Sequence, residues 1–421
     1  MEGRGVPAVV LGTDAFLSLA QATAATHGVP HLALATVAHP IGGLPPAAVA
    51  ARAEGVVDAV LAALTADPAP PVAGGPPPPG PREAPDDLDA FQEFAAAEGW
   101  SDGLPVLPPT AARVARVLGR RAADAGRVVA TLAPRGGAAT LEAIAVNAAL
   151  AGAGPEHLPV VVAAVRALAR PAFNLEAVQT TTHPCAPLLI VNGPVAARLG
   201  IAGGANALGN GHRANAVIGR AVRLVLQNVG GARPGREDRA TLGHPGKFTY
   251  CVAENAAASP WPPLHVERGF APDDSTVTVC AAEAPHNVND HASTTPAALL
   301  RALAGTAATP GHNNVYLGGE PLLLLGPEHA ATFAAAGWSK DDVRRALWEQ
   351  ARVPLARFSA ENLARFAAID PARFGGPAPG AEAHLTARPE DVMVVVAGGP
   401  GKHSAIVPTF GATRSVTEPV D

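Results

Sequence analysis

Side chains that can transfer protons or attack a substrate are concentrated between Val178 and Asn255. Between apolar runs, this stretch holds three histidines, two of the three cysteines and Glu254: His183, Cys185, His212, His244, Cys251 and Glu254. Glycine and proline turns separate the runs, and loops held by a rigid scaffold often carry functional groups. We therefore expect one site that gathers these groups in a single cleft of the fold.

The catalytic prediction centres on the turn His244-Pro245-Gly246-Lys247 and the short strand that follows it. Glu254 is the predicted general base, while His183 and His244 handle further protons. Cys185 and Cys251 are candidate thiol nucleophiles or metal ligands, since a nearby imidazole lowers a thiol pKa. Core positions for the two cysteines and a solvated strand end for Glu254 are the structural alternatives.

Two glycine-rich segments predict binding of a small anion. Residues 203–215 lead into a helix expected at 216–228, whose free N–H groups favour negative charge. A second loop follows an apolar strand at 398–404. The predicted substrate-binding residues are Asn206, His212, Arg213, Asn215, Lys247, Lys402 and His403. The first segment does not have the spacing of a phosphate loop or a dinucleotide-binding loop, so we assign no NAD or ATP site. An ordinary glycine-rich connection is the alternative.

A divalent transition metal is a further option for the cofactor, which the sequence leaves open. His286 and His291 lie five residues apart with Asn and Asp between them. Such side chains bind transition metals, although this spacing matches neither a helical metal motif nor a zinc finger. The segment His312-Asn313-Asn314 is a similar but weaker signal.

Composition limits the class of protein. The 421 residues are 48% hydrophobic and 16% charged, with 44 glycines and 43 prolines, so large cores and many tight turns are expected. The net charge of -5 gives no support for nucleic-acid binding. No apolar run reaches the roughly 18–20 residues that span a bilayer. Three well-separated cysteines make no disulfide framework, and we expect a cytoplasmic protein with free thiols.

The elements that position the candidate residues read as α/β. Strands at 6–11 and 32–38 alternate with helices at 15–26 and 46–64, which predicts an incomplete βαβα unit over residues 1–65. Two strands are too few for a stable parallel sheet, so this unit must borrow strands from the rest of the chain or from a partner. Residues 66–86 form a Pro/Gly-rich linker.

For residues 87–421 we predict a larger α/β domain with a parallel or mixed sheet. Three segments, 187–200, 321–337 and 392–407, each run from an apolar strand into a glycine turn. Ligands bind beyond the carboxyl ends of such strands. Helices are expected at 111–121, 138–151 and 158–169, and Ser339 to Asp342 resembles a capping box that opens another at 341–350.

Two passages resemble the UGSC-motif (seleno)protein family. These are GTDAFLSLAQATAATHGVPHLALATVAHPIGGLPPAAVAARAEGVVDAV near the N-terminus and GWSDGLPVLPPT at 99–110 together with residues 178–291. The resemblance implies an enzyme with no settled reaction. The family is named for a selenocysteine- or cysteine-containing loop after its first strand. This sequence has no such motif before Val6 and no cysteine before Cys185. The redox loop is missing, lost to a start-site choice or supplied by another polypeptide.

We therefore expect an enzyme that acts on a small, anionic metabolite by thiol- or metal-assisted redox or lyase-type chemistry in the larger domain. A non-catalytic ligand-binding or docking subunit of a redox complex is the alternative, and a hydrolase with Cys251 as nucleophile is a third option. Besides the substrate, the expected partner is a second copy of the chain or a subunit that completes the N-terminal unit. Neither nucleic acid nor a membrane is expected.

Overall fold

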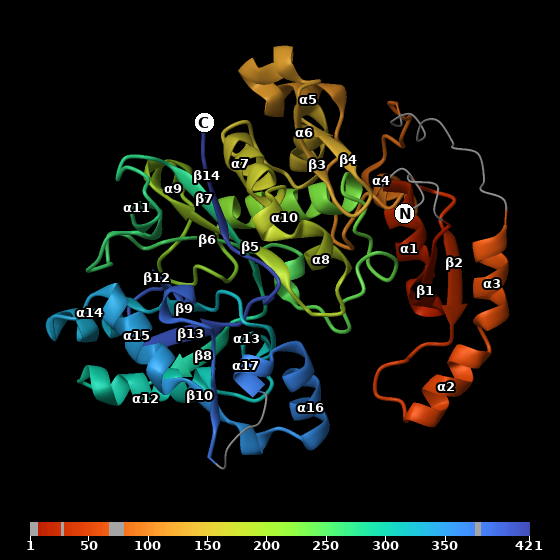
Figure 1. Cartoon of the computed structure of the whole chain (residues 1–421). Helices are drawn as coiled ribbons and strands as arrows, with labels where there is room; N and C mark the ends of the chain where they lie inside the picture. Colours follow the sequence, from red (N-terminus) through yellow and green to blue (C-terminus); the bar gives the residue numbers. More distant parts are fainter. Residues whose placement is uncertain (1–6, 27–28, 67–79, 375–379) are drawn as a thin grey trace.

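The computed structural model describes residues 7–26, 29–66, 80–374 and 380–421 (Figure 1). Its N-terminal unit begins with β1 (Val9–Thr13), and β2 (Ala33–Val37) pairs with it in parallel. The short helix η2 (Asp14–Phe16) and α1 (Leu17–Thr26) connect the strands, and α2 (Pro46–Glu54) and α3 (Val57–Thr65) follow. The predicted βαβα order is correct, but the helix expected at 46–64 is divided in two at Gly55.

The N-terminal sheet gains no third strand from the rest of the described chain. Its core is small and consists of Ala35, Val37 and Val56 with a few neighbours. On β1, Val10 is 43% exposed and Leu11 is 52% exposed. Because successive side chains of a strand point to opposite faces, both faces of β1 carry exposed apolar surface. The prediction that the rest of this chain adds strands to the N-terminal sheet is therefore wrong for the described residues.

The predicted linker falls largely outside the described residues, because residues 67–79 are not among them. From Gly80 to Asp87 the chain forms neither helix nor strand. Helix α4 (Leu88–Ala97) then begins, and the Asp87 side chain accepts a hydrogen bond from the Ala90 N–H at its first turn. The boundary at 66–86 stays a prediction.

The first large sheet has the strand order β14-β7-β5-β6. Its strands are β5 (Ala186–Asn192), β6 (Cys251–Ala253), β7 (Thr276–Ala282) and β14 (Val416–Pro419). β6 is parallel to β5, whereas β7 is antiparallel to both β5 and β14. Helices α6 (Leu141–Leu150), α7 (Leu158–Leu168) and α10 (Arg213–Asn228) share a core with one face of this sheet.

The second large sheet has the order β12-β9-β13-β8. Its strands are β8 (His286–Asn289), β9 (Leu322–Leu325), β12 (Met393–Val396) and β13 (His403–Val407), and its helices are α12 (Pro296–Ala307), α14 (Pro327–Ala335) and α15 (Lys340–Gln350). The predicted capping box opens α15: Ser339 Oγ accepts from the Asp342 N–H, and Asp342 accepts from the Ser339 N–H.

The two sheets pack face to face and form the inner layers of a four-layer α/β/β/α arrangement (Figure 1). On β5, Leu189 and Val191 face the helices of the first layer, while Leu188 and Ile190 join a cluster that also holds Leu322 and Val395 of the second sheet. Burying each such side chain stabilises the fold by about 1.5–3 kcal/mol. The α/β class is as predicted, but the three strand–turn segments belong to two mixed sheets instead of one.

The remaining elements are short strand pairs and helices outside the two large sheets. Two small antiparallel pairs are β3 (Val128–Leu132) with β4 (Gly137–Thr140) and β10 (Arg352–Pro354) with β11 (Glu382–His384). The other helices are α5 (Ala111–Leu118), η3 (Gly119–Asp124), η4 (Pro171–Phe173), α8 (Leu175–Thr180), α9 (Pro194–Leu199), η5 (Pro245–Lys247), α11 (Leu264–Glu267), α13 (Asn313–Leu317), η6 (Leu355–Arg357), α16 (Ala360–Ile369), α17 (Pro371–Phe374) and η7 (Pro389–Asp391).

Within the described ranges, no single helix is both long enough and apolar enough to cross a membrane. One bent pair, Leu158–Leu168 with Pro171–Thr180, passes by length and composition, with a bend of 73° between its two parts. The apolar side chains of α7 are buried in the core of the first sheet.

Candidate functional site

The predicted site residues lie at two opposite ends of the first sheet. His183 and His244 precede β5 and β6, whereas Glu254 follows β6 and the loop with His212 contacts that same far end. β5 has seven residues and therefore separates the ends by about 20 Å. The prediction that His183, His212, His244 and Glu254 share one cleft is wrong.

Glu254 is a buried structural carboxylate in this fold. Its side chain is 0% exposed, and it lies 3.3 Å from the Lys340 ammonium of α15. The Asn192 amide and the Leu264 N–H both donate to its Oε2, at 2.6 and 2.7 Å. The Lys340 contact joins the two layers at this end, and both carboxylate oxygens are engaged, which favours a structural role for Glu254 over the predicted general base.

The two candidate thiols are core residues. Cys185 is 2% exposed and Cys251 is 4% exposed, and burial raises the pKa of each to about 12. A thiol with that pKa stays protonated near neutral pH and is a poor nucleophile. The structural alternative is therefore correct for both cysteines, and the hydrolase reading based on Cys251 loses its nucleophile.

The two glycine-rich loops meet beyond the carboxyl ends of β6 and β12. Gly398 N–H donates to Gly203 C=O, and Asn255 N–H donates to Val396 C=O. Gly399 has no room for a side chain, because a β-carbon there would clash with Ala205. The loop at 398–404 therefore lies at a strand-end edge, as predicted for the glycine turn after that strand, but this edge is remote from His183.

Most predicted binding groups of the first loop are used within the loop itself. Asn215 is buried, and its amide bonds the backbone of Ala202, Ala207 and Cys251. The Asn206 amide donates to Asn210 C=O, and a ring nitrogen of His212 lies 3.1 Å from Ala205 C=O. The Arg213 guanidinium donates to Gly152 C=O at 3.2 Å. These contacts favour the alternative of an ordinary structural connection, and substrate binding by this segment stays a prediction.

At the other end of the sheet, His183 forms a short contact with a carboxylate. Its Nε2 lies 2.6 Å from Glu283 Oε1, and its ring stacks on Phe410 with centroids 5.4 Å apart. The other ring nitrogen, Nδ1, is buried and has no hydrogen-bond partner. A carboxylate on Nε2 favours the tautomer with the proton on that atom and leaves the Nδ1 lone pair as a base.

His244 lies beside this pair but has both ring nitrogens engaged. Its Nδ1 accepts from the Gly246 N–H, and its Nε2 donates to Ala282 C=O at 3.2 Å. Burial lowers the pKa of His244, which is consistent with a neutral ring. Its ring packs edge-on against Tyr250, whose hydroxyl donates to Glu283 C=O. We assign His244 to positioning this turn, and the predicted proton-handling role for it is not supported.

His312 is the second imidazole with an unpaired nitrogen. At the start of α13, its Nδ1 accepts from the Asn314 N–H, which leaves the proton on Nε2 of the neutral ring. Nε2 is buried without a partner, and burial lowers the pKa of His312 to about 4. Thr409, next to Phe410, accepts from Asn313 at its C=O and donates its N–H to Asn314. These contacts place His312 near His183 and Glu283.

Beside this cluster lies a group of three charged side chains, two cations and one carboxylate. Asp238 is shared by two cations: Lys247 Nζ lies 2.7 Å from its carboxylate, and Arg223 Nη2 lies 3.3 Å from it. Lys247 lines a cavity with Cys185, Gln179 and other residues, and the cavity encloses about 10 Å³ of free space, which is room for one water. Gln179 Nε2 is buried there without a partner.

Sequence reasoning missed Glu283 and Asp238 and ranked His312 low. Glu283 is the first residue after β7, and a carboxylate directly after a buried strand is a usable signal. The register of β5 with β7 pairs Ala186 with Ala282, so it places Glu283 beside the segment that holds His183. Only this pairing, which joins residues 100 positions apart, identifies the contact.

The two predicted metal ligands, His286 and His291, do not face each other in the structure. Within the described ranges, no group of three or more His, Cys, Asp or Glu side chains is arranged to hold a metal ion. His286 and His291 do not pair, and a ring nitrogen of His291 instead lies 3.3 Å from one of His403. Lys402 donates to His291 C=O. Lys402 and His403, predicted to bind substrate, therefore belong to this surface cluster on the second sheet.

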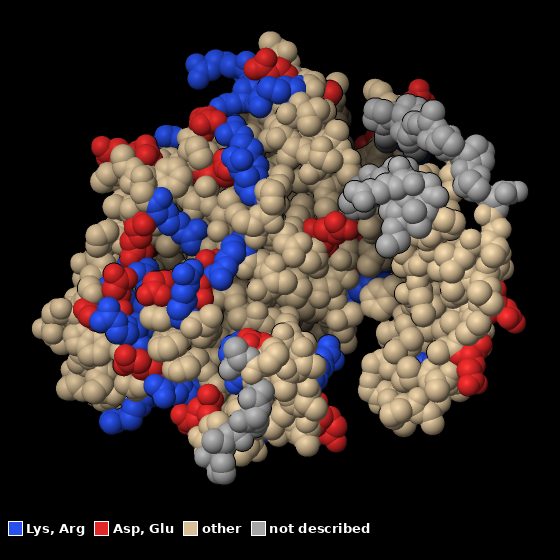
Figure 2. All heavy atoms as spheres, viewed as in Figure 1, with Lys and Arg blue, Asp and Glu red and all other residues tan. Residues whose placement is uncertain are grey.

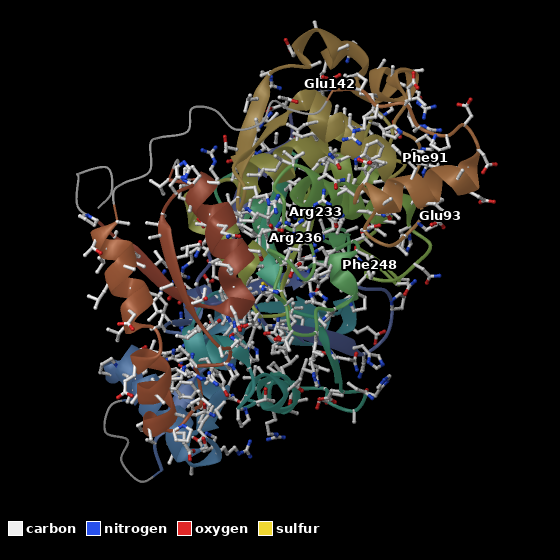
Figure 3. All side chains as sticks on the ribbon, turned by 90° about the vertical axis from the view of Figure 1, so that its right-hand side faces the viewer. Phe91, Glu93, Glu142, Arg233, Arg236 and Phe248 are labelled. Carbon is white, nitrogen blue, oxygen red and sulfur yellow. The ribbon has the colours of Figure 1, made fainter. Side chains whose placement is uncertain are left out.

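The N-terminal unit carries a polar cluster at the carboxyl ends of its two strands. Thr13 Oγ1 lies 3.1 Å from His39 Nδ1, and the His39 N–H donates to Asp14. His39 packs edge-on against Phe16, and the Arg239 guanidinium of the larger part lies over that ring at 5.5 Å. In the view of Figure 3, Arg233 and Arg236 of the same loop lie between the N-terminal unit and α4.

Comparison with known proteins identifies a family relationship for the N-terminal unit. Residues 1–66 match the model of the UGSC family. The match agrees with the resemblance seen in the sequence of that segment and includes Thr13, Asp14 and His39. It covers 66 of the 421 residues, so the UGSC relationship holds for the N-terminal unit. No curated protein and no solved structure matches the chain.

Proposed function

We propose that this chain is an enzyme that moves a proton on a small anionic metabolite, with His183 Nδ1 as the base. The observation that carries the proposal is the short His183–Glu283 contact combined with an unpaired, buried Nδ1 on the same ring. Glu283 orients the imidazole and stabilises the imidazolium that forms when Nδ1 takes a proton. The His312 Nε2–H is a neutral donor that can polarise a substrate oxygen.

The charge of the neighbouring residues supports an anionic substrate. Lys247 and Arg223 share the single carboxylate of Asp238, so this group carries a net positive charge beside the cluster. Lyase- or isomerase-type proton abstraction fits these groups better than thiol chemistry, because the three cysteines are buried. Free cysteines fit a reducing compartment, and we propose that the protein acts in the cytoplasm.

The test is solvent exchange of carbon-bound hydrogen. A panel of small carboxylates that carry a carbonyl group is incubated with the protein in D2O, and loss of their C–H signals is followed by NMR. The wild type should accelerate exchange of at least one compound, and His183→Asn should slow that exchange by about 10²–10⁴ fold. His286→Asn is the matched control, because His286 is exposed and lies outside the cluster.

Two results would contradict the proposal. One is exchange that is equally fast in His183→Asn, provided that the variant has the wild-type unfolding midpoint. The other is that the wild type exchanges no compound of the panel faster than His183→Asn does.

A second function, docking, is favoured by the N-terminal unit alone. Val10 and Leu11 leave apolar surface on a two-stranded sheet, and the visible face of this unit carries few charges (Figure 2). We propose that β1 pairs with a strand of a second copy or of another protein. If so, sedimentation should show a homo-oligomer or a stable complex that Leu11→Lys dissociates. The proposal is contradicted if the wild type is a monomer without a bound partner, as the Leu11→Lys variant is expected to be.

A further inference from the structure

On the second sheet, far from the proposed base, two exposed histidines point at each other. His291 follows β8 and His403 begins β13, and the strands pair so that Asn289 lies opposite His403. The two Nε2 atoms are 3.3 Å apart and the rings are close to perpendicular, at 82°. We propose that these two Nε2 atoms bind one divalent transition metal ion, such as Zn²⁺.

The separation of the nitrogens fits a shared ion. Two imidazoles on a tetrahedral zinc, each with a Zn–N bond of about 2.0–2.1 Å, place their nitrogens about 3.3–3.4 Å apart. A direct hydrogen bond from nitrogen is commonly shorter, with a mode of about 2.9–3.0 Å. The 3.3 Å between the His291 and His403 nitrogens therefore matches the separation of two ligands on one tetrahedral ion.

The surrounding contacts hold the His403 ring and the backbone at His291. The Nδ1 of His403 lies 3.1 Å from Asn287 Oδ1, so its proton is held there and Nε2 keeps its lone pair. Such outer contacts fix the tautomer of ligand histidines. On the other side, Lys402 donates to His291 C=O, and the Asp290 carboxylate accepts the N–H groups of Ala292 and Ser293.

The charge around the pair tolerates a cation. Lys402 is the nearby ammonium, and two carboxylates offset it: Asp290, and Glu328, which accepts from the Gly401 N–H. His329 lies behind the pair and is occupied by Ser404 Oγ and Asp290 C=O. With only two protein ligands, the remaining coordination positions are open to water or to a small anionic ligand.

The experiment is calorimetric titration of Zn²⁺ into the full chain after treatment with a chelator. We expect one ion per chain, a loss of affinity of at least 10-fold in His291→Ala and in His403→Ala, and a smaller loss in Asn287→Ala. His286→Ala is the matched control, because it removes an exposed histidine three ladder positions from His403, and it should bind like the wild type.

A second readout separates this site from the other histidines. Cu²⁺ bound at the site should give an electron paramagnetic resonance spectrum with coupling to two nitrogens, and each single variant should remove it. The proposal is overturned if neither variant weakens binding, or if His286→Ala weakens it as much as they do.

Discussion

His183 Nε2 lies 2.6 Å from Glu283 Oε1, although 100 positions separate the two residues. The antiparallel register of β5 and β7 creates this contact, since Ala186 faces Ala282 and both polar residues lie just beyond the ladder. The ring is then fixed by Glu283 on one side and by Phe410 on its face. A fixed imidazole with one free nitrogen is suited to proton transfer.

The buried thiols should be unreactive in the folded protein. Because burial raises the pKa values of Cys185, Cys251 and Cys280 to about 12, the thiolate fraction near pH 8 is very small. Titration with a chromogenic disulfide at pH 8 should label none of the three rapidly. The same titration in a denaturant should label all three at once. Rapid labelling of Cys185 in the folded state would restore the thiol mechanism.

The pKa of His312 should make the stability of the fold depend on pH. In the unfolded chain His312 binds a proton below about pH 6.5, whereas in the folded chain it does so only near pH 4. The free energy of unfolding should therefore fall as the pH drops from 6.5 toward 4, by up to about 3 kcal/mol from this residue. Denaturant unfolding of the wild type and His312→Gln at several pH values measures it.

The difference between these two proteins isolates His312. Burial also lowers the pKa values of His157, His244 and His329, but those residues are present in both proteins. Equal pH slopes for the wild type and His312→Gln would show that His312 titrates normally and is not buried as described.

Removal of the Lys340 ammonium should destabilise the junction of the two sheets. Lys340→Met leaves the Glu254 carboxylate buried without its charge partner, and such a change costs about 3–5 kcal/mol. The matched control is Arg345→Met, an exposed position on the same helix, where a change within about 0.5 kcal/mol is expected. Equal effects of the two variants in urea unfolding would contradict the structural role given to Glu254.

Asn215 should matter for folding and not for ligand binding. Asn215→Ala removes its bonds to Ala202, Ala207 and Cys251, and we expect a loss of about 2–4 kcal/mol in unfolding free energy. The exposed Asn210, on the same loop, is the control, and Asn210→Ala should change stability little. A stable Asn215→Ala protein would reopen the prediction that this residue binds substrate.

Local features of the fold were predictable because local residues determine them. The strand–helix order of residues 9–65, the caps at Asp87 and Thr110 and the capping box at Ser339 follow from short-range rules. The division into two sheets was not predictable from these rules. Leu188 to Val191 and Leu322 to Leu325 are apolar on both faces, so their periodicity identifies buried strands but not the sheet to which each belongs.

The prediction of one shared cleft was wrong because residues close in sequence were assumed to be close in space. His183 and Glu254 belong to one rich segment, yet a seven-residue strand carries the chain from one end of the sheet to the other between them. Glu283 and His312 lie outside that segment and enter the cluster only through strand register and the contacts of Thr409. Prediction of such a site requires the pairing of β5 with β7 first.

The tautomer of His183 decides whether this residue can act as the base. It can be measured by ¹⁵N NMR of histidine-labelled protein, with His183→Asn to assign the signals. We predict a proton on Nε2, a bare Nδ1, and a shift of the Nδ1 signal when malonate is added as an anionic probe. A proton on Nδ1, or an Nδ1 signal that malonate leaves unchanged while it perturbs other sites, would contradict His183 as the base.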